Sequence, residues 1–293
     1  MIVEALIYDA FSKVPGKGNP AGVVLSGNKL SDEQMQRIAK ELSFNETAFV
    51  VQDNNTNLSV RYFTPGHEVP MCGHATIATM YALAENGMIK NGFTTIQTEL
   101  GKLDIEILFD ECIRIGMKQI AYKEMEYLGE ADSLAKVIGI ESYMIDDRYP
   151  IRYVNTGLWT LLVPIKKLSY FNNMCPHTKE FPKVLKELNT SSIHPFCTET
   201  YDEKCELHGR HFSSPYSGTV EDAVTGTASG AMGCYYEKYI CSSHKKRIIR
   251  VEQGNEIGRE GIVEVEIPKN LSNPVKIYGT AVFSQSRKIF IEE

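Results

Sequence analysis

The sequence predicts an α+β protein made of two similar strand-rich units, each folded around one apolar helix. Three observations favour this class. A motif from the first half of the chain recurs in the second half, short strand-like runs outnumber helical ones, and each half holds one apolar helical run. With 293 residues, the chain is long enough for one large domain or two ordinary ones.

The repeated motif begins with Arg-x-Phe, passes through a loop of Pro, Gly and acidic residues, and reaches Gly-x-Ala-[Thr/Ser]-x-Ala before a helix. Its copies are residues 61–87 and 210–239, so Gly73 matches Gly226, 153 positions later. A weaker echo links "GNPAGVVL" to "NTGLWTLLVPI", in which a small-residue turn precedes a strand. Recurrence over half the chain length indicates a duplicated α/β unit.

The strands are short β-branched or alternating runs between Gly, Asn and Asp turns. We expect them at 1–11, 47–52, 58–63, 93–100, 103–109, 113–120, 247–254, 262–267 and 281–293. Helices are fewer. Ser31, followed three residues later by Gln34, predicts a capping box at the start of the first helix. The helices are expected at 31–42, 74–87, 132–138, 178–188 and 227–240.

Composition and charge exclude several classes of protein. Hydrophobic residues make up 43% and charged residues 23%, as in a folded globular chain. The net charge of −6 argues against nucleic acid or an anionic membrane as partner, and no apolar run is long enough to span a bilayer. The first residues resemble a strand and not a signal peptide, and the seven cysteines lack a C-x-x-C pair. We therefore expect a cytoplasmic protein with reduced thiols.

The two repeated turns have a chemical consequence. Small residues at the start of a helix leave the first backbone N–H groups open to an anion, which the helix dipole also favours. For one turn alone, close packing against a sheet is an adequate explanation. Recurrence of the turn beside titratable residues favours a small anionic ligand, held in a cleft where the two helix ends meet.

Four titratable residues lie near these turns, and the sequence gives little support to several roles that such residues could have. They are Glu46, Cys72, His74 and Asp222. A thiol nucleophile is disfavoured, because residues two apart on a turn, such as Cys72 and His74, rarely face one another. Metal binding by His67 with Cys72 and His74, or by Cys205, His208 and His211, lacks the paired spacing of a structural zinc site. The loop "VPGKGNPAG" lacks the order of a nucleotide-binding P-loop.

The sequence resembles the PhzF-like proteins of phenazine biosynthesis, which belong to the diaminopimelate-epimerase-like superfamily. The matching segments run in order from residue 9 to about 261 and include "NETAFV", "RYFTPGHEVPMCGHATIAT", "RHFSSPYSGTVEDAVTGTASGA" and "VEQGNEIGREG". The resemblance implies two similar domains, each a curved mixed sheet around a central helix, with the active site in the cleft between them. We place these domains at 1–118 and 119–293, and the strand at about 282–293 could cross back to the first.

The resemblance also implies the chemistry. Members of this kind use no cofactor and no metal, act on small carboxylate-bearing molecules and are often homodimers. The matching positions imply Glu46 as the acid/base with His74 and Asp222 as catalytic partners, and Asn45, Gly73, Gly226 and Thr227 as substrate-binding residues. Two positions depart from the family pattern. Ala223 replaces the usual Pro and Asn45 the usual Ser, so no phenazine substrate is assumed.

The cysteines separate this chain from the two-base epimerases of the superfamily, which carry a thiol at both turns. Here Cys72 occupies the first position but Thr225 the second, and a hydroxyl is too weak an acid to replace a thiol. Stereoinversion by paired thiols is therefore disfavoured. We expect an isomerase that moves a proton with Glu46. The alternatives are a lyase or hydratase at the same cleft, or a metabolite-binding protein whose acid/base residues are idle.

Overall fold

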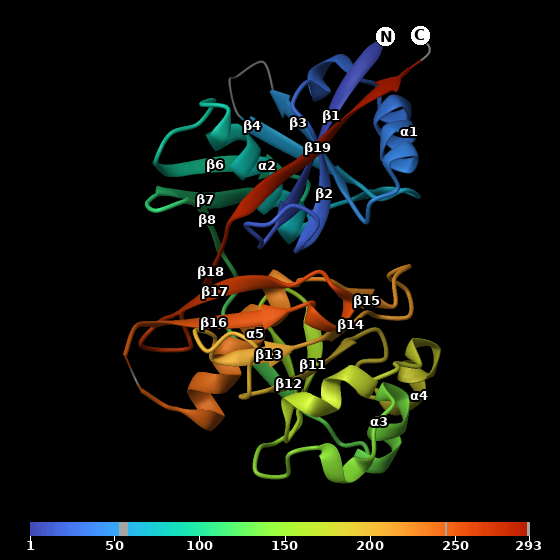
Figure 1. Ribbon diagram of the computed structural model, residues 1–293, viewed down its shortest axis with the longest axis vertical. Helices are drawn as coiled ribbons and strands as arrows, with labels where there is room; N and C mark the ends of the chain where they lie inside the picture. The colour runs from blue at the N-terminus through green and yellow to red at the C-terminus, as the bar shows by residue number, and fades with distance from the viewer. Residues whose placement is uncertain (53–57, 244, 292–293) are drawn as a thin grey trace. The chain divides into compact units, whose positions relative to one another are not determined.

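The computed structural model describes residues 1–52, 58–243 and 245–291, which divide into two compact units (Figure 1). The first unit contains Met1–Lys118 and the segment from Tyr278 onward, and the second contains Gln119–Ile277. The last strand, β19 (Ala281–Phe290), runs antiparallel beside β1 (Ile2–Ala10), where the red and dark blue ribbons of Figure 1 lie together. The end of the chain is therefore part of the first unit.

The first unit is a mixed sheet. Strand β2 pairs antiparallel with β1 and parallel with β3, while β3 and β4, β6 and β7, and β7 and β8 form antiparallel pairs. The remaining elements of this unit are β2 (Asn19–Val24), η1 (Gly27–Lys29), α1 (Asp32–Leu42), β3 (Thr47–Gln52), β4 (Leu58–Phe63), β5 (Glu68–Val69), α2 (Gly73–Glu85), β6 (Gly92–Thr98), β7 (Gly101–Phe109) and β8 (Ile113–Lys118).

The two helices of the first unit differ in how much of their surface is buried. Helix α1 starts after Ser31 with the expected capping box and buries one face, through Met35, Ile38 and Leu42. Helix α2 has ten buried residues out of thirteen and contacts β1, β2, β3, β8 and β19. Its Ala- and Thr-rich sequence has no polar face, so it forms the centre around which the sheet curves.

The second unit repeats this topology. Strand β11 pairs antiparallel with β10 and parallel with β12, as β2 does with β1 and β3. Helix α5 contacts β10, β11, β16 and β17 and is buried nearly throughout. The elements of this unit are β9 (Lys123–Glu126), α3 (Ala131–Ile138), η2 (Ser142–Met144), β10 (Arg152–Asn155), β11 (Trp159–Pro164), η3 (Leu168–Asn173), η4 (Thr178–Glu180), α4 (Phe181–Val184), β12 (Ser192–Cys197), β13 (Leu207–Gly209), β14 (His211–Phe212), β15 (Glu221–Asp222), α5 (Gly226–Tyr235), the π-helix η5 (Tyr236–Ile240), β16 (Arg247–Gln253), η6 (Asn255–Ile257) and β17 (Gly261–Ile267). Strand β18 (Lys276–Gly279) spans the division between the units at Ile277 and Tyr278.

The repeat extends to individual side chains. Strands β4 and β5 place Phe63 opposite Glu68, and strands β14 and β15 place Phe212 opposite Glu221. The Arg of each Arg-x-Phe motif makes two hydrogen bonds with this Glu: Arg61 at 2.7 and 2.7 Å, and Arg210 at 2.8 and 2.6 Å. Each bidentate pair closes the loop that leads to a central helix.

One predicted helix is wrong and several strands were missed, among them β9, β10, β12 and β18. The segment 178–188 forms only a 3₁₀ turn and the four-residue α4, because the chain turns at Leu185 so that Phe181 and Leu185 both enter the core. Strand β12 has all six residues buried, so it lacks the alternation of apolar and polar residues that predicts strands. The end of the predicted strand 281–293 lies outside the described residues.

Among the described residues, no helix is both long and apolar enough to cross a membrane. None of the seven cysteines, all of which lie in the described part of the chain, forms a disulfide.

Candidate active site

The two central helices begin at the matched glycines. Helix α2 starts at Gly73 after Cys72, and α5 starts at the buried Gly226 after Thr225. Neither preceding side chain caps its helix by accepting a hydrogen bond from a first-turn amide. These helix ends therefore keep backbone donors for solvent or an anion, as the repeated turns indicated.

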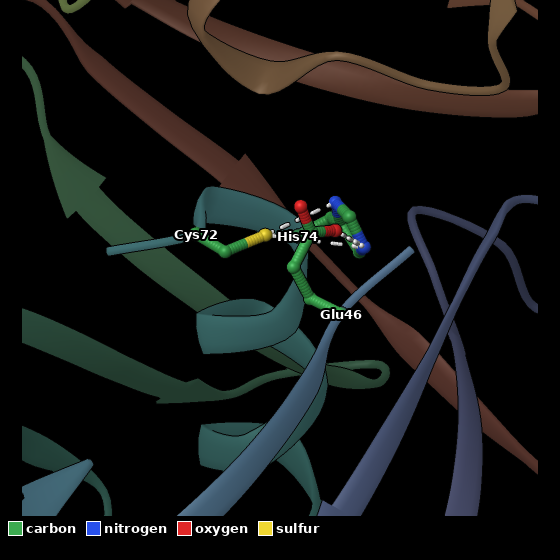
Figure 2. A group of neighbouring side chains, drawn as sticks. All are labelled: Glu46, Cys72 and His74. Atoms are coloured by element: carbon green, nitrogen blue, oxygen red, sulfur yellow. Dashed lines mark hydrogen bonds and ion pairs between the residues drawn. The ribbon is translucent and has the colours of Figure 1, made fainter. Parts of the chain in front are cut away.

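Three side chains meet at the start of α2 (Figure 2): Glu46, Cys72 and His74. The Nε2 atom of His74 is 3.3 Å from Glu46 Oε2, and Cys72 Sγ is 3.4 Å from His74 Nδ1. The imidazole thus lies between a carboxylate and a thiol. Cys72 and His74 were expected not to face one another, which is wrong. Cys72 precedes the helix in an extended conformation, and this brings its sulfur back to the ring two residues later.

The Glu46 carboxylate is mostly buried, but one of its oxygens has no hydrogen bond. Its side chain is 21% exposed and that of His74 is 9% exposed. Oxygen Oε2 of Glu46 is buried, and no group in the described chain forms a hydrogen bond with it. The contact with His74 is short enough for an ion pair but does not meet hydrogen-bond geometry. A buried carboxylate oxygen in this state is suited to exchange a proton with a ligand.

The backbone around these side chains is firmly anchored. The Glu46 carbonyl accepts a hydrogen bond from the Gly22 amide at 3.2 Å, immediately before β3 begins. The Cys72 carbonyl accepts one from the Thr76 amide at 3.0 Å and one from the Thr76 hydroxyl at 2.7 Å. That hydroxyl lies 2.7 Å from the hydroxyl of the fully buried Tyr62. The sheet and the first turn of α2 therefore fix Glu46 relative to His74.

In the second unit, Asp222 lies in a network of its own. The Thr225 hydroxyl donates to Asp222 Oδ2 at 2.5 Å. The Gln253 amide group donates to the Asp222 carbonyl at 2.8 Å and accepts from the Thr225 amide at 3.2 Å. Gln253 thus links the end of β16 to the turn before α5. Sequence reasoning did not select it, although it lies in "VEQGNEIGREG", one of the segments that carry the family resemblance.

Two histidines beside Asp222 were also missed as a pair. His211 lies opposite Asp222 in the β14–β15 register, and its Nδ1 is 3.1 Å from Nδ1 of the fully buried His194. Burial, together with His211 and another neighbouring histidine, lowers the pKa of His194 well below its usual range. Burial also lowers the pKa of His211, against the opposing effect of Asp222. Both imidazoles are therefore neutral near pH 7, so one of them donates to the other.

The predicted substrate-binding residues have different surroundings. The Thr227 carbonyl accepts a hydrogen bond from the Thr156 hydroxyl at 2.8 Å, and a methyl group of Thr227 packs on Gly157. Thr227 and Asn45 are both partly exposed. A Cβ atom added to Gly73 would meet no atom within 4 Å, so there is open space beside the first residue of α2.

The site residues are divided between the units. Glu46, Asn45, Gly73 and His74 belong to the first unit, and Asp222, Gly226 and Thr227 belong to the second. That the two groups face one ligand stays a prediction.

The two histidine and cysteine sets considered for metal binding do not assemble within the described residues. His67 Nδ1 contacts the Thr64 hydroxyl at 3.4 Å. His208 is fully buried, with its ring nitrogens each 3.0 Å from a carboxylate oxygen of Glu252 or Glu256. Burial alone would lower the pKa of His208, but these carboxylates raise it above its ordinary value.

Comparison with known proteins shows which family the chain belongs to. The family model described as "Phenazine biosynthesis-like protein" matches residues 8–287. The Bacillus subtilis protein named "Uncharacterized isomerase YfhB" is 46% identical over 97% of each chain. A Pseudomonas chlororaphis protein named trans-2,3-dihydro-3-hydroxyanthranilate isomerase is 28% identical over 88% of each chain.

Solved structures support the predicted fold class. A Bacillus anthracis structure described as a phenazine biosynthesis protein of the PhzF family is 44% identical, with a TM-score of 0.96 over 99% of this chain and 100% of that one. A hydroxyproline epimerase from Agrobacterium vitis is only 11% identical but has a TM-score of 0.61 over 98% and 92% of the two chains, which indicates a shared fold. The predicted α+β fold of two epimerase-like domains is confirmed.

Proposed function

This chain is an isomerase of the phenazine biosynthesis-like family, and we propose that it isomerises a small carboxylate-bearing metabolite by cofactor-independent proton transfer. The observation that carries the proposal is the position of Glu46. Its carboxylate has one buried oxygen without a hydrogen bond and lies 3.3 Å from His74, beside the open start of α2. This combines a group that can carry a proton with a place for an anion.

In the proposed reaction, Glu46 takes a proton from a C–H bond of the bound metabolite. The electron pair of that bond moves into the adjoining conjugated system and towards the substrate carboxylate. The backbone amides at the helix start stabilise this negative charge, because their dipoles already point at it. Glu46 then returns the proton to another carbon of the same system, so the product is an isomer and no atom is gained or lost.

The other site residues receive supporting roles. His74 contacts the Glu46 carboxylate and orients it. Asp222 and Thr227 assist or orient the substrate, as the family resemblance implies, and Asn45 lies next to the proton carrier. Gly73 leaves room for the ligand, because a side chain there would enter the open space. A homodimer in the cytoplasm belongs to the same proposal, and light scattering of the purified protein tests the dimer.

A ligand screen provides the substrate class. Small cyclic and acyclic carboxylic acids, including trans-2,3-dihydro-3-hydroxyanthranilate, are tested for thermal stabilisation. A ligand at 100 times its dissociation constant adds about 2.7 kcal/mol to the free energy of unfolding. The anions should stabilise the protein more than their esters or amides. Equal stabilisation by charged and neutral forms would contradict binding at a helix end.

Deuterium exchange then tests the reaction itself. In D₂O, an isomerase that uses Glu46 should introduce solvent deuterium into the substrate, and mass spectrometry measures this. Loss of water or another leaving group without an isomeric product would indicate a lyase or hydratase. Binding of ligands with no exchange in any of them would indicate a metabolite-binding protein and would overturn the proposal.

A further inference from the structure

The three side chains at the start of α2 offer three different ligand atoms to one ion. A carboxylate oxygen of Glu46, the sulfur of Cys72 and a ring nitrogen of His74 all lie within 4.8 Å of one another (Figure 2). We propose that they form a zinc-binding site, and that bound zinc blocks proton transfer by Glu46. The second part of this inference rests on the proposed function, whereas the first part does not.

The distances between these atoms are close to those of a tetrahedral zinc site. Zinc bonds of about 2.0–2.1 Å to nitrogen, 2.0–2.2 Å to oxygen and 2.3 Å to sulfur separate N from O by about 3.3 Å and N from S by about 3.6 Å. Here Nε2 of His74 is 3.3 Å from Glu46 Oε2 and 4.0 Å from Cys72 Sγ. The sulfur would have to move about 0.4 Å closer to Nε2 to match the N–S separation. The third separation, between Glu46 Oε2 and Cys72 Sγ, is no more than 4.8 Å.

The chemistry of the donors selects the ion. A thiolate, an imidazole and a carboxylate together suit zinc, whereas magnesium and calcium prefer oxygen ligands alone. The Glu46 oxygen that lies nearest His74 is buried without a hydrogen bond, so it needs no other partner displaced before it binds an ion. Zinc takes cysteine as thiolate and histidine as neutral imidazole, so binding releases the thiol proton.

The site also has room for a fourth ligand. Gly73 is the residue between Cys72 and His74, and a Cβ atom there would meet no atom within 4 Å. Water or a small anion can enter this open space and complete the coordination. Three protein ligands and one open position are typical of catalytic zinc sites, whereas structural sites have four protein ligands. The ion would neutralise the Glu46 carboxylate and occupy its lone pair, so Glu46 could not accept a substrate proton.

The duplication supplies an internal comparison. The positions in the second unit that match Cys72 and His74 are Thr225 and Thr227. The Thr225 hydroxyl is already bonded to Asp222, and neither threonine offers a thiolate or an imidazole. The zinc site is therefore specific to the first unit, and the chain should bind one ion.

The binding experiment uses the full chain after treatment with a chelator. In the parent protein, Cys112, Cys175 and Cys241 are replaced by Ser, because these cysteines are partly or fully exposed and could take up zinc themselves. Burial raises the pKa of Cys197, Cys205 and Cys234 to about 12, so they stay protonated. Competition with a chromogenic chelator measures the stoichiometry and affinity for Zn²⁺, and Co²⁺ reports thiolate ligation by its charge-transfer absorption.

We expect one Zn²⁺ per parent chain and a thiolate band with Co²⁺. Adding Cys72→Ser should remove the band and weaken zinc binding at least about tenfold, the lower bound for losing a group that supports a metal ligand. Glu46→Gln should weaken binding while keeping the band, so it tests the site even if Cys72→Ser fails to fold. Absence of zinc binding in the parent, or a zinc affinity in both variants equal to that of the parent, would overturn the site.

Inhibition is measured with a ligand that shows deuterium exchange. Zinc should stop deuterium exchange in the parent. The parent that also carries Cys72→Ser should continue exchange in the presence of zinc. If zinc binds through Cys72 but exchange continues, the site stands and the claim that it blocks Glu46 fails, which also counts against Glu46 as the proton carrier. If zinc does not bind and exchange depends on Glu46, the zinc site fails alone.

Discussion

Replacing Glu46 by Gln tests the central claim with the smallest change of shape. The amide keeps the size and most of the hydrogen-bonding capacity of the carboxylate, but it cannot carry a proton at neutral pH. It also removes the negative charge that lies 3.3 Å from His74 Nε2. If Glu46 is the acid/base, the variant should bind the ligand and fail to convert it.

The expected loss of reaction rate in Glu46→Gln follows from the role of the carboxylate as acid/base. A positioned acid/base contributes about 10²–10⁴-fold to the rate. This range corresponds to about 2.7–5.4 kcal/mol in the activation free energy. The free energy of unfolding should change by no more than about 1 kcal/mol, because the carboxylate oxygen beside His74 makes no hydrogen bond that the amide would break. Catalysis and stability should thus separate clearly.

The assay measures the rate of deuterium incorporation together with ligand affinity and melting temperature. Glu41→Gln is a matched control, because Glu41 is an exposed glutamate near the end of α1. Cys72→Ser should cost the rate much less than Glu46→Gln and lower stability by about 1 kcal/mol through a poorly satisfied hydroxyl. If Cys72→Ser abolishes exchange while Glu46→Gln leaves it intact, the thiol is the base and our reasoning is wrong.

Three further predictions concern the helix start, a buried histidine and the duplicated ion pair. Gly73→Ala should weaken ligand binding with little change in melting temperature, because its Cβ meets no atom within 4 Å. Gly233→Ala should destabilise the fold without a specific effect on binding, because its Cβ would lie 2.8 Å from Val265. The reverse pattern in melting and binding curves would refute this prediction. The raised pKa of His208 means that its stabilising charge is complete below the ordinary value of 6.5 and is lost as pH rises through the raised value. In urea unfolding, the advantage of the wild type over His208→Gln should therefore shrink as the pH rises above 6.5, and a constant difference would contradict it. Arg210→Met should cost about 3–5 kcal/mol because it leaves Glu221 buried and unpaired, and Arg61→Met, in the more exposed matching pair, about 1 kcal/mol or less; equal costs would show that burial does not decide the difference.

Local patterns in the sequence predicted much of this protein. The capping box at Ser31 and the starts of both central helices at the matched glycines were visible because helix ends depend on a few neighbouring residues. The duplication was visible because Arg-x-Phe and the Gly-Ala turn recur at a constant spacing. Glu46 and His74 could be selected because they lie in segments that resemble one family.

Other features depend on contacts that no local pattern encodes. Leu185 leaves the predicted helix 178–188 because core packing outweighs helix propensity over so few residues. Gln253 reaches Asp222 from the end of β16, and His194 meets His211 across neighbouring strands. These pairs form only when the register of the sheet brings distant segments together.

The sequence by itself therefore determined the repeated units, the positions of the central helices and the identity of the proton-carrying glutamate as a hypothesis. Only the tertiary structure showed that the side chain of Cys72 meets those of Glu46 and His74. The loop before β3 and the turn before α2 are more than twenty residues apart in the chain, and the sheet sets the distance between them. A carboxylate can act with an imidazole and a thiol only if the distances between them are a few ångströms. The packing of α2 inside the sheet sets these distances.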